Sequence, residues 1–153
     1  MKRPLESYFE PAKWWVIAII LVGTIRILLT TMGFPNELVK FASMTVIMAI
    51  GSVYLAVWSA WHDWNYRDLF VFSYFITVPY MAVEVVGLSL AGLSGQMNIF
   101  HTREYSFGAP LWLHLTGHII GGLTWEPWTI WLICCVVFWL TVKMYGKAAD
   151  TRV

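Results

Sequence analysis

WWVIAIILVGTIRILLTTMG, residues 14–33, is the stretch that decides the fold. A helix over this run is about 30 Å long at about 1.5 Å per residue, which matches the hydrocarbon thickness of a bilayer. The run is longer than the apolar core of a secretory signal, and it lacks the small-x-small cleavage site of one. We therefore predict a first transmembrane helix that the mature protein retains.

The composition of the whole chain points the same way. Of 153 residues, 59% are hydrophobic and 12% are charged, whereas about a quarter of the residues of a soluble domain are charged. The net charge is +1 and the longest basic run is Lys2-Arg3, which excludes the basic field that nucleic-acid binding requires. We predict an all-α integral membrane protein that forms a single membrane domain over residues 1–153.

Three further apolar runs, at about 40–61, 69–92 and 127–145, predict a bundle of four transmembrane helices with the first span at 14–33. Small residues recur every four positions in the second and third runs, and such spacing is typical of close helix packing. We expect these two helices to meet along the stripes Ser52, Ala56 and Ala60, and Gly87, Ala91 and Gly95.

The segment at 108–124 has a poor composition for a lipid-exposed span, with two histidines, four glycines and Pro110. With four spans and the N-terminus inside, seven Lys or Arg residues lie inside and two outside; a fifth span would change this to four and five. The positive-inside rule therefore favours four spans, both termini in the cytoplasm, and a reentrant or interfacial segment near 108–124.

Two charged residues, Arg26 and Glu84, lie inside predicted spans. Counted from the starts of their spans, they lie about 18 Å and about 22 Å along parallel helices, so they share the outer half of the membrane. A charge at this depth costs about 2.5–3.5 kcal/mol and needs a partner. The sequence leaves two interpretations open: an Arg26–Glu84 ion pair, or a Glu84 that carries protons or binds a ligand.

His114 and His118 are four residues apart and share one face if their segment is helical. They could hydrogen-bond backbone groups freed by the nearby glycines, act as acid/base groups with Glu84, or bind a metal or haem together with His101. The metal signal is weak, because the spacing lacks the glutamate of the HExxH pattern.

Aromatic and polar residues near these histidines suggest a ligand pocket. Tyr80 and Trp112 could form aromatic walls, although core packing explains single rings equally well. Arg103, Glu104 and Tyr105 open the approach to the segment, either as a solvated loop or as a rim that binds an anionic group.

These residues favour a pocket for an apolar or lipid-like molecule in the outer half, with Glu84, His114 and His118 as candidate catalytic residues and Arg26, Tyr80, Arg103, Glu104, Tyr105 and Trp112 as ligand-binding residues. Whether the protein is an enzyme stays open. The alternatives are an accessory subunit of a larger membrane complex and a metal or haem carrier. The expected partners are membrane lipids, an apolar small molecule, and other membrane subunits or further copies of this chain.

Overall fold

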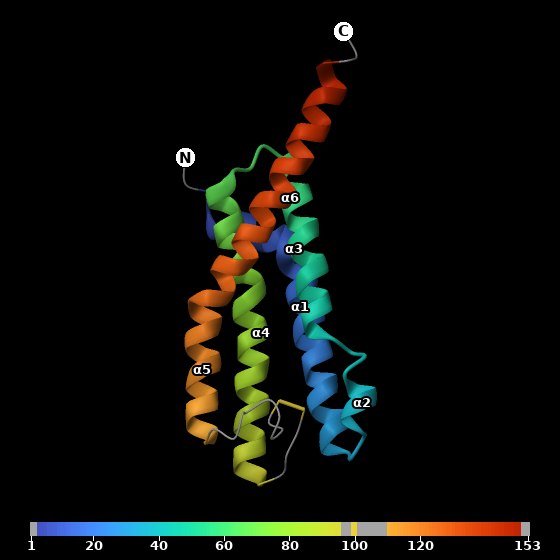
Figure 1. The fold of residues 1–153 in the computed structure, drawn as a ribbon, viewed down its shortest axis with the longest axis vertical. Helices are drawn as coiled ribbons and strands as arrows, with labels where there is room; N and C mark the ends of the chain where they lie inside the picture. Colours follow the sequence, from blue (N-terminus) through green and yellow to red (C-terminus); the bar gives the residue numbers. More distant parts are fainter. Residues whose placement is uncertain (1–2, 96–98, 101–109, 151–153) are drawn as a thin grey trace.

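The structure, a computed structural model, describes residues 3–95, 99–100 and 110–150, and only the backbone of the last five of these. The described residues form helices joined by short connections (Figure 1). In chain order these are α1 (Leu5–Thr31), α2 (Asn36–Val39), α3 (Met44–Trp61), α4 (Tyr66–Ser94), α5 (Leu111–Leu123) and α6 (Trp125–Asp150).

Four segments are long and apolar enough to cross a membrane, as the sequence predicted: Leu5–Thr31, Asn36–Trp61, Tyr66–Ser94 and Leu111–Tyr145. The start of α1 and the end of α6 lie toward one end of the bundle, together with the α3–α4 connection (Figure 1). We call this the terminal end, and the opposite one, with Thr31, Met44 and Ser94, the cavity end. The chain runs along the bundle an even number of times, so the start of α1 and the end of α6 lie at the same end.

The first helix begins at Leu5, well before the expected start at 14. Pro11 lies inside it and removes one backbone hydrogen bond. Tyr8 and Ala12 are buried on either side of this proline, in the core cluster that also contains Phe72. Packing against the bundle therefore keeps this polar stretch helical despite its proline.

The central helix is α4, which packs against α1, α3, α5 and α6. One core cluster, around Ile19, Leu55 and Phe72, fills the terminal half of the bundle. A second cluster, around Met44 and Leu88, fills the cavity half.

Here the structure corrects the expected reentrant or interfacial segment. α5 runs alongside α4 and continues into α6 after a bend at Thr124 (Figure 1). A reentrant segment would turn back, and an interfacial one would lie across the helix ends. Residues 111–123 instead extend the fourth candidate span, which begins at Leu111 and not near 127.

α3 and α4 contact each other, as expected, and single residues of the small-residue stripes also approach other parts of the chain. Ser52 and Ala56 are buried on α3, and the thiol of Cys134 on α6 lies 3.5 Å from the backbone oxygen of Ser52. A Cβ atom at Gly87 would lie 2.5 Å from the ring of Phe100. Gly95 ends α4 with a positive φ of 67°, which favours glycine.

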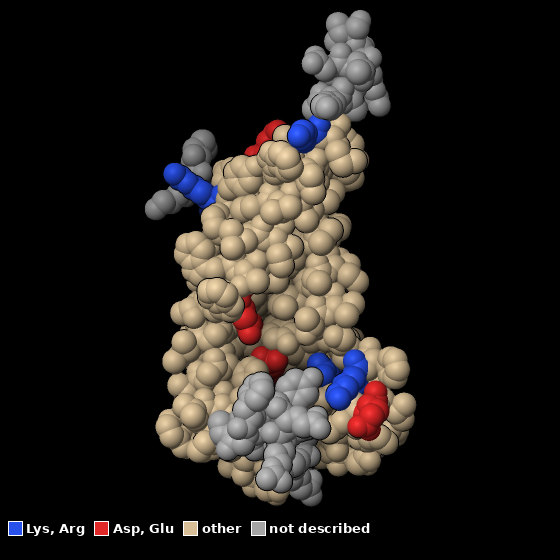
Figure 2. Space-filling view, viewed as in Figure 1, with Lys and Arg blue, Asp and Glu red and all other residues tan. Residues whose placement is uncertain are grey.

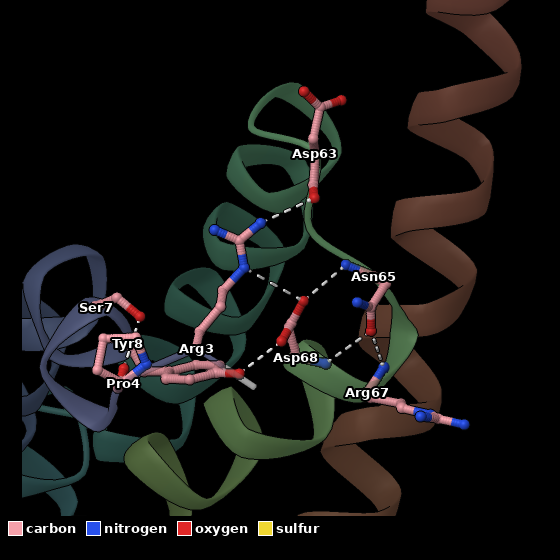
Figure 3. Close-up of polar contacts among 8 residues, drawn as sticks. All are labelled: Arg3, Pro4, Ser7, Tyr8, Asp63, Asn65, Arg67 and Asp68. Atoms are coloured by element: carbon pink, nitrogen blue, oxygen red, sulfur yellow. Dashed lines mark hydrogen bonds and ion pairs between the residues drawn. The ribbon is translucent and has the colours of Figure 1, made fainter. Parts of the chain in front are cut away.

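A cluster of polar side chains connects the start of α1 to the start of α4 by hydrogen bonds at the terminal end (Figure 3). Asp68 is 6% exposed and accepts hydrogen bonds from the Tyr8 hydroxyl at 2.6 Å and from the Asn65 amide at 3.0 Å. Asn65 in turn caps α4 by accepting from the backbone of Arg67 and Asp68. Arg3 donates to the Asp63 carbonyl and lies 4.3 Å from the centre of the Trp64 ring.

Candidate functional site

A cavity of about 290 Å³ lies in the cavity half of the bundle. α1, α3, α4 and α5 each contribute to its wall, as does the connection that contains Lys40 and Ser43. Figure 2 shows acidic and basic side chains around a hollow in this half, on a surface that is otherwise largely uncharged. The lining residues are Arg26, Lys40, Ser43, Thr45, Tyr80, Glu84, Ile99, Phe100 and His118.

Glu84 is held on one side of this cavity by a histidine from the next helix. It is 8% exposed, and its Oε2 atom lies 2.8 Å from the Nδ1 atom of His118. The same contact satisfies the geometry of an ion pair when the imidazole is protonated. Glu84 and His118 therefore link α4 to α5 through a partly buried polar contact.

His114 extends this link by one residue. Its Nε2 atom lies 3.0 Å from the Nε2 atom of His118, one helical turn further along α5. Both ring nitrogens of His118 thus have partners within the protein. Glu84 and His118 line the cavity and His114 does not, so the chain runs from Glu84 through His118 to His114 along α5.

The donor and acceptor rules limit the proton arrangements of this chain. With both rings neutral and Glu84 ionised, His118 donates from Nδ1 to Glu84 and accepts at Nε2 from His114. With one additional proton, His118 is an imidazolium and donates at both nitrogens, to Glu84 and to His114. The chain can therefore hold one more proton without losing a hydrogen bond, as a proton relay requires.

Hydroxyl groups form another part of the polar wall. The Tyr80 and Thr45 hydroxyl oxygens lie 3.3 Å apart, so α4 and α3 share a hydrogen bond there. Tyr80 also interacts electrostatically with Glu84. The Ser43 side chain accepts from the Val46 amide and so caps the start of α3.

Arg26 and Lys40 bring two cationic groups to the same cavity. The guanidinium carbon of Arg26 lies 5.2 Å from the centre of the Phe100 ring. Arg26 and Glu84 were expected at the same depth along the bundle, and both line this cavity. The ion pair that the structure describes for Glu84, however, is with His118 and not with Arg26, because α5 lies against α4 there.

The other expected site residues either lie away from the cavity or fall outside the described residues. Trp112 is 67% exposed and does not line the cavity. His101, Arg103, Glu104 and Tyr105 lie outside the described residues. Among the described residues, no group of three His, Cys, Asp or Glu side chains has the geometry of a metal site.

Several residues of the site carried no signal strong enough to be predicted. Lys40 and Thr45 come from the short connection and the start of the next helix, and only the fold brings them to Glu84. Glu126, in the first turn of α6, interacts electrostatically with Glu84 and His118. Its Oε2 atom is buried and has no hydrogen-bond partner among the described residues. The one sequence feature that could have drawn attention to Glu126 is its position between Trp125 and Trp128.

Comparison of the chain with protein-family models, with curated proteins and with solved structures finds no match. The functional argument therefore depends on the geometry of the site.

Proposed function

We propose that this chain is a multi-pass integral membrane protein that binds the polar end of a lipid-like molecule in the cavity and exchanges a proton with it through Glu84. The observation that carries this proposal is the hydrogen-bonded chain Glu84–His118–His114, which ends at the cavity. Such a partly buried polar chain is costly to maintain in an apolar helix bundle unless it has a use.

The surroundings of the cavity favour an amphiphile over a water-soluble ligand. Ile99 and Phe100 line one part of the wall, while the other lining residues are polar or charged. The volume of about 290 Å³ corresponds to about ten water molecules at about 30 Å³ each. That is enough for a head group and a few methylene groups, so a longer tail would lie along the apolar helix surface outside.

Glu84 is the group that would take or give the proton. Both nitrogens of His118 are already used, whereas Glu84 lines the cavity and needs only one oxygen for His118. A proton taken from the ligand binds to the carboxylate, and the ligand keeps the electron pair of the broken bond. His118 keeps its Nδ1 proton and continues to donate it to Oε2 of the now neutral carboxyl group, while its Nε2 atom accepts from His114. Proton transfer by a positioned carboxylate is ordinary acid/base catalysis.

The proposal includes an orientation. Of the nine Lys and Arg residues other than Arg26, seven fall on the side of the termini in the expected topology, so by the positive-inside rule both termini lie in the cytoplasm. The cavity then lies in the outer half of the membrane.

The test is mass spectrometry of molecules extracted from detergent-purified protein. Wild-type protein is expected to retain an amphiphile that Glu84→Gln loses, because glutamine cannot carry the charge that holds His118 and the ligand. His62→Gln is the matched control, since His62 stacks on Trp58 at the terminal end, away from the cavity.

Two results would overturn the proposal. Retention of the same molecule in equal amount by Glu84→Gln would place its binding elsewhere. Copurification in a fixed ratio with other membrane proteins, with no effect of Glu84→Gln on their activity, would favour the accessory-subunit role.

A further inference from the structure

We infer that Glu126 is a second proton-holding carboxyl group of the site, which keeps a proton while Glu84 is ionised. Its meaning for the reaction rests on the proposed function, because a protonated Glu126 leaves Glu84 as the base that meets the ligand. The proton on Glu126 does not require a ligand and can be measured without one. Three features of the site support the inference: the depth of Glu126, the unequal partners of the two carboxyl groups, and their mutual interaction.

Glu126 lies deep in the fourth candidate span. This span runs from Leu111 to Tyr145, so at about 1.5 Å per residue Glu126 is about 22 Å from one end and about 28 Å from the other. Its half-buried side chain comes from the first turn of α6. An ionised carboxylate at this depth is costly, and it needs hydrogen-bond donors or a cation unless it binds a proton.

The two carboxyl groups differ in their hydrogen-bond partners. The Nδ1 atom of His118 lies 2.8 Å from the Oε2 atom of Glu84, and a hydrogen bond donated there favours the ionised carboxylate. The Oε2 atom of Glu126 is buried and has no such partner in the described part of the chain. Of the two groups, Glu126 is therefore the one that loses more by ionising.

The start of α6 does not replace the missing donor. The first turn of a helix usually favours a negative charge through its free amide groups. Here α5 leads directly into α6, and the Thr124 amide already donates to the carbonyls of Ile120 and Gly121. Pro127 follows Glu126 and has no amide hydrogen. This helix terminus thus offers Glu126 fewer donors than an ordinary one.

The two carboxyl groups also interact with each other. Glu126 interacts electrostatically with Glu84 and His118, and Tyr80 interacts with both glutamates. The other helix packed against α6 is α3, which contains no charged residue. Two carboxylates that share one site do not readily ionise together, so the pair is more stable with one proton. The hydrogen bond from His118 assigns the negative charge to Glu84 and the proton to Glu126.

This arrangement gives the two glutamates different roles. Glu84 lines the cavity and is ionised before a ligand binds, so it can take a proton. Glu126 does not line the cavity and keeps Glu84 in this state by holding the proton that the pair shares. Such a division between two carboxyl groups is a common way to set which one acts as the base.

The test is infrared spectroscopy of the detergent-purified protein without added ligand. A neutral carboxylic acid gives a carbonyl band that an ionised carboxylate lacks, so the band reports the proton directly. At neutral pH we expect this band in the wild-type protein and its loss in Glu126→Gln. Glu37→Gln is the matched control, because Glu37 is an exposed glutamate in the first turn of α2, and it should leave the band unchanged.

Two further variants test the assignment and the coupling. Glu126→Asp keeps a carboxyl group at this position, so it should shift the frequency of the band, and it identifies the group even if Glu126→Gln fails to fold. Glu84→Gln removes the neighbouring negative charge, so Glu126 should ionise more easily. The midpoint of the band's titration should then move to lower pH by about one unit or more.

The outcomes separate this inference from the proposed function. The absence of the band at neutral pH, or its persistence in Glu126→Gln, would overturn the inference. A titration that does not respond to Glu84→Gln would also overturn it, because the two groups would not share a proton. If the spectra agree with expectation while Glu84→Gln still retains the extracted amphiphile, the proton on Glu126 stands and the proposed function fails.

Discussion

The Nδ1 atom of His118 lies 2.8 Å from the Oε2 atom of Glu84. This contact joins α4 to α5, which also meet through apolar side chains and through a hydrogen bond from the Tyr74 hydroxyl to the Leu123 carbonyl. It also fixes the rotation of α5, since His114 lies one turn away and bonds to the same ring. One pair of residues therefore connects the path of the fourth span with the chemistry of the cavity.

We expect Glu84 and His118 to stabilise the protein jointly. In a double-mutant cycle of Glu84→Gln and His118→Asn, the coupling free energy of unfolding should be about 1.5–3 kcal/mol, the range for hydrogen bonds to charged groups. The measurement is reversible unfolding in mixed micelles. Additive effects of the two substitutions would show that the contact is absent.

The Tyr8–Asp68 hydrogen bond should be important for the terminal end of the bundle. Tyr8→Phe leaves a buried carboxylate without one of its donors, so we expect a loss of about 1.5–3 kcal/mol in the free energy of unfolding. Tyr54→Phe is the control, because the Tyr54 ring packs against Trp15 and its hydroxyl makes no hydrogen bond within the described part of the chain. Equal effects of the two substitutions would contradict this arrangement.

Two glycines should respond to alanine in opposite directions. A Cβ atom at Gly23 would collide with the β-branched Val83 side chain and lie 2.6 Å from the sulfur of Met44. Gly23→Ala should therefore destabilise the protein by about 1–3 kcal/mol through overpacking.

A Cβ atom at Gly117 meets nothing within 4 Å, so Gly117→Ala should stabilise α5 by about 0.5–1 kcal/mol through helix propensity. Thermal unfolding in detergent compares the two variants. A destabilising effect at Gly117 would show that the exposed face of α5 is covered by something in the protein.

The proposed orientation predicts a labelling pattern. Phe41 and Arg67 are both exposed, at opposite ends of the bundle. In a background with Cys134→Ala and Cys135→Ala, an impermeant maleimide added to intact cells should label Phe41→Cys and leave Arg67→Cys unlabelled until the cells are opened. The reverse pattern would place the termini outside.

The apolar runs predicted four spanning helices because length and hydropathy alone identify them. The path of residues 111–123 was mispredicted because a segment with two histidines and several glycines was considered too polar and too irregular for a lipid-exposed helix. In the structure His118 contacts Glu84 and His114 contacts His118. Gly122 lets the Met81 side chain approach closely. α5 and α6 together form one candidate span, so four candidate spans remain, and the orientation of the termini stays a prediction.

The site was accessible to sequence reasoning only in part. Depth along parallel helices placed Arg26 level with Glu84, and helical periodicity placed His114 and His118 on one face. The rotation of each helix, which decides that Glu84 pairs with His118, depends on packing between distant segments. The same dependence explains why Lys40 and Thr45 were missed.

The most direct test of the central claim is an experimental structure of the protein extracted with its native lipids. We predict density for a head group in the cavity between Arg26 and Glu84, with His118 still bonded to both Glu84 and His114. A cavity filled by protein side chains, or a Glu84 that turns away from His118, would contradict the account.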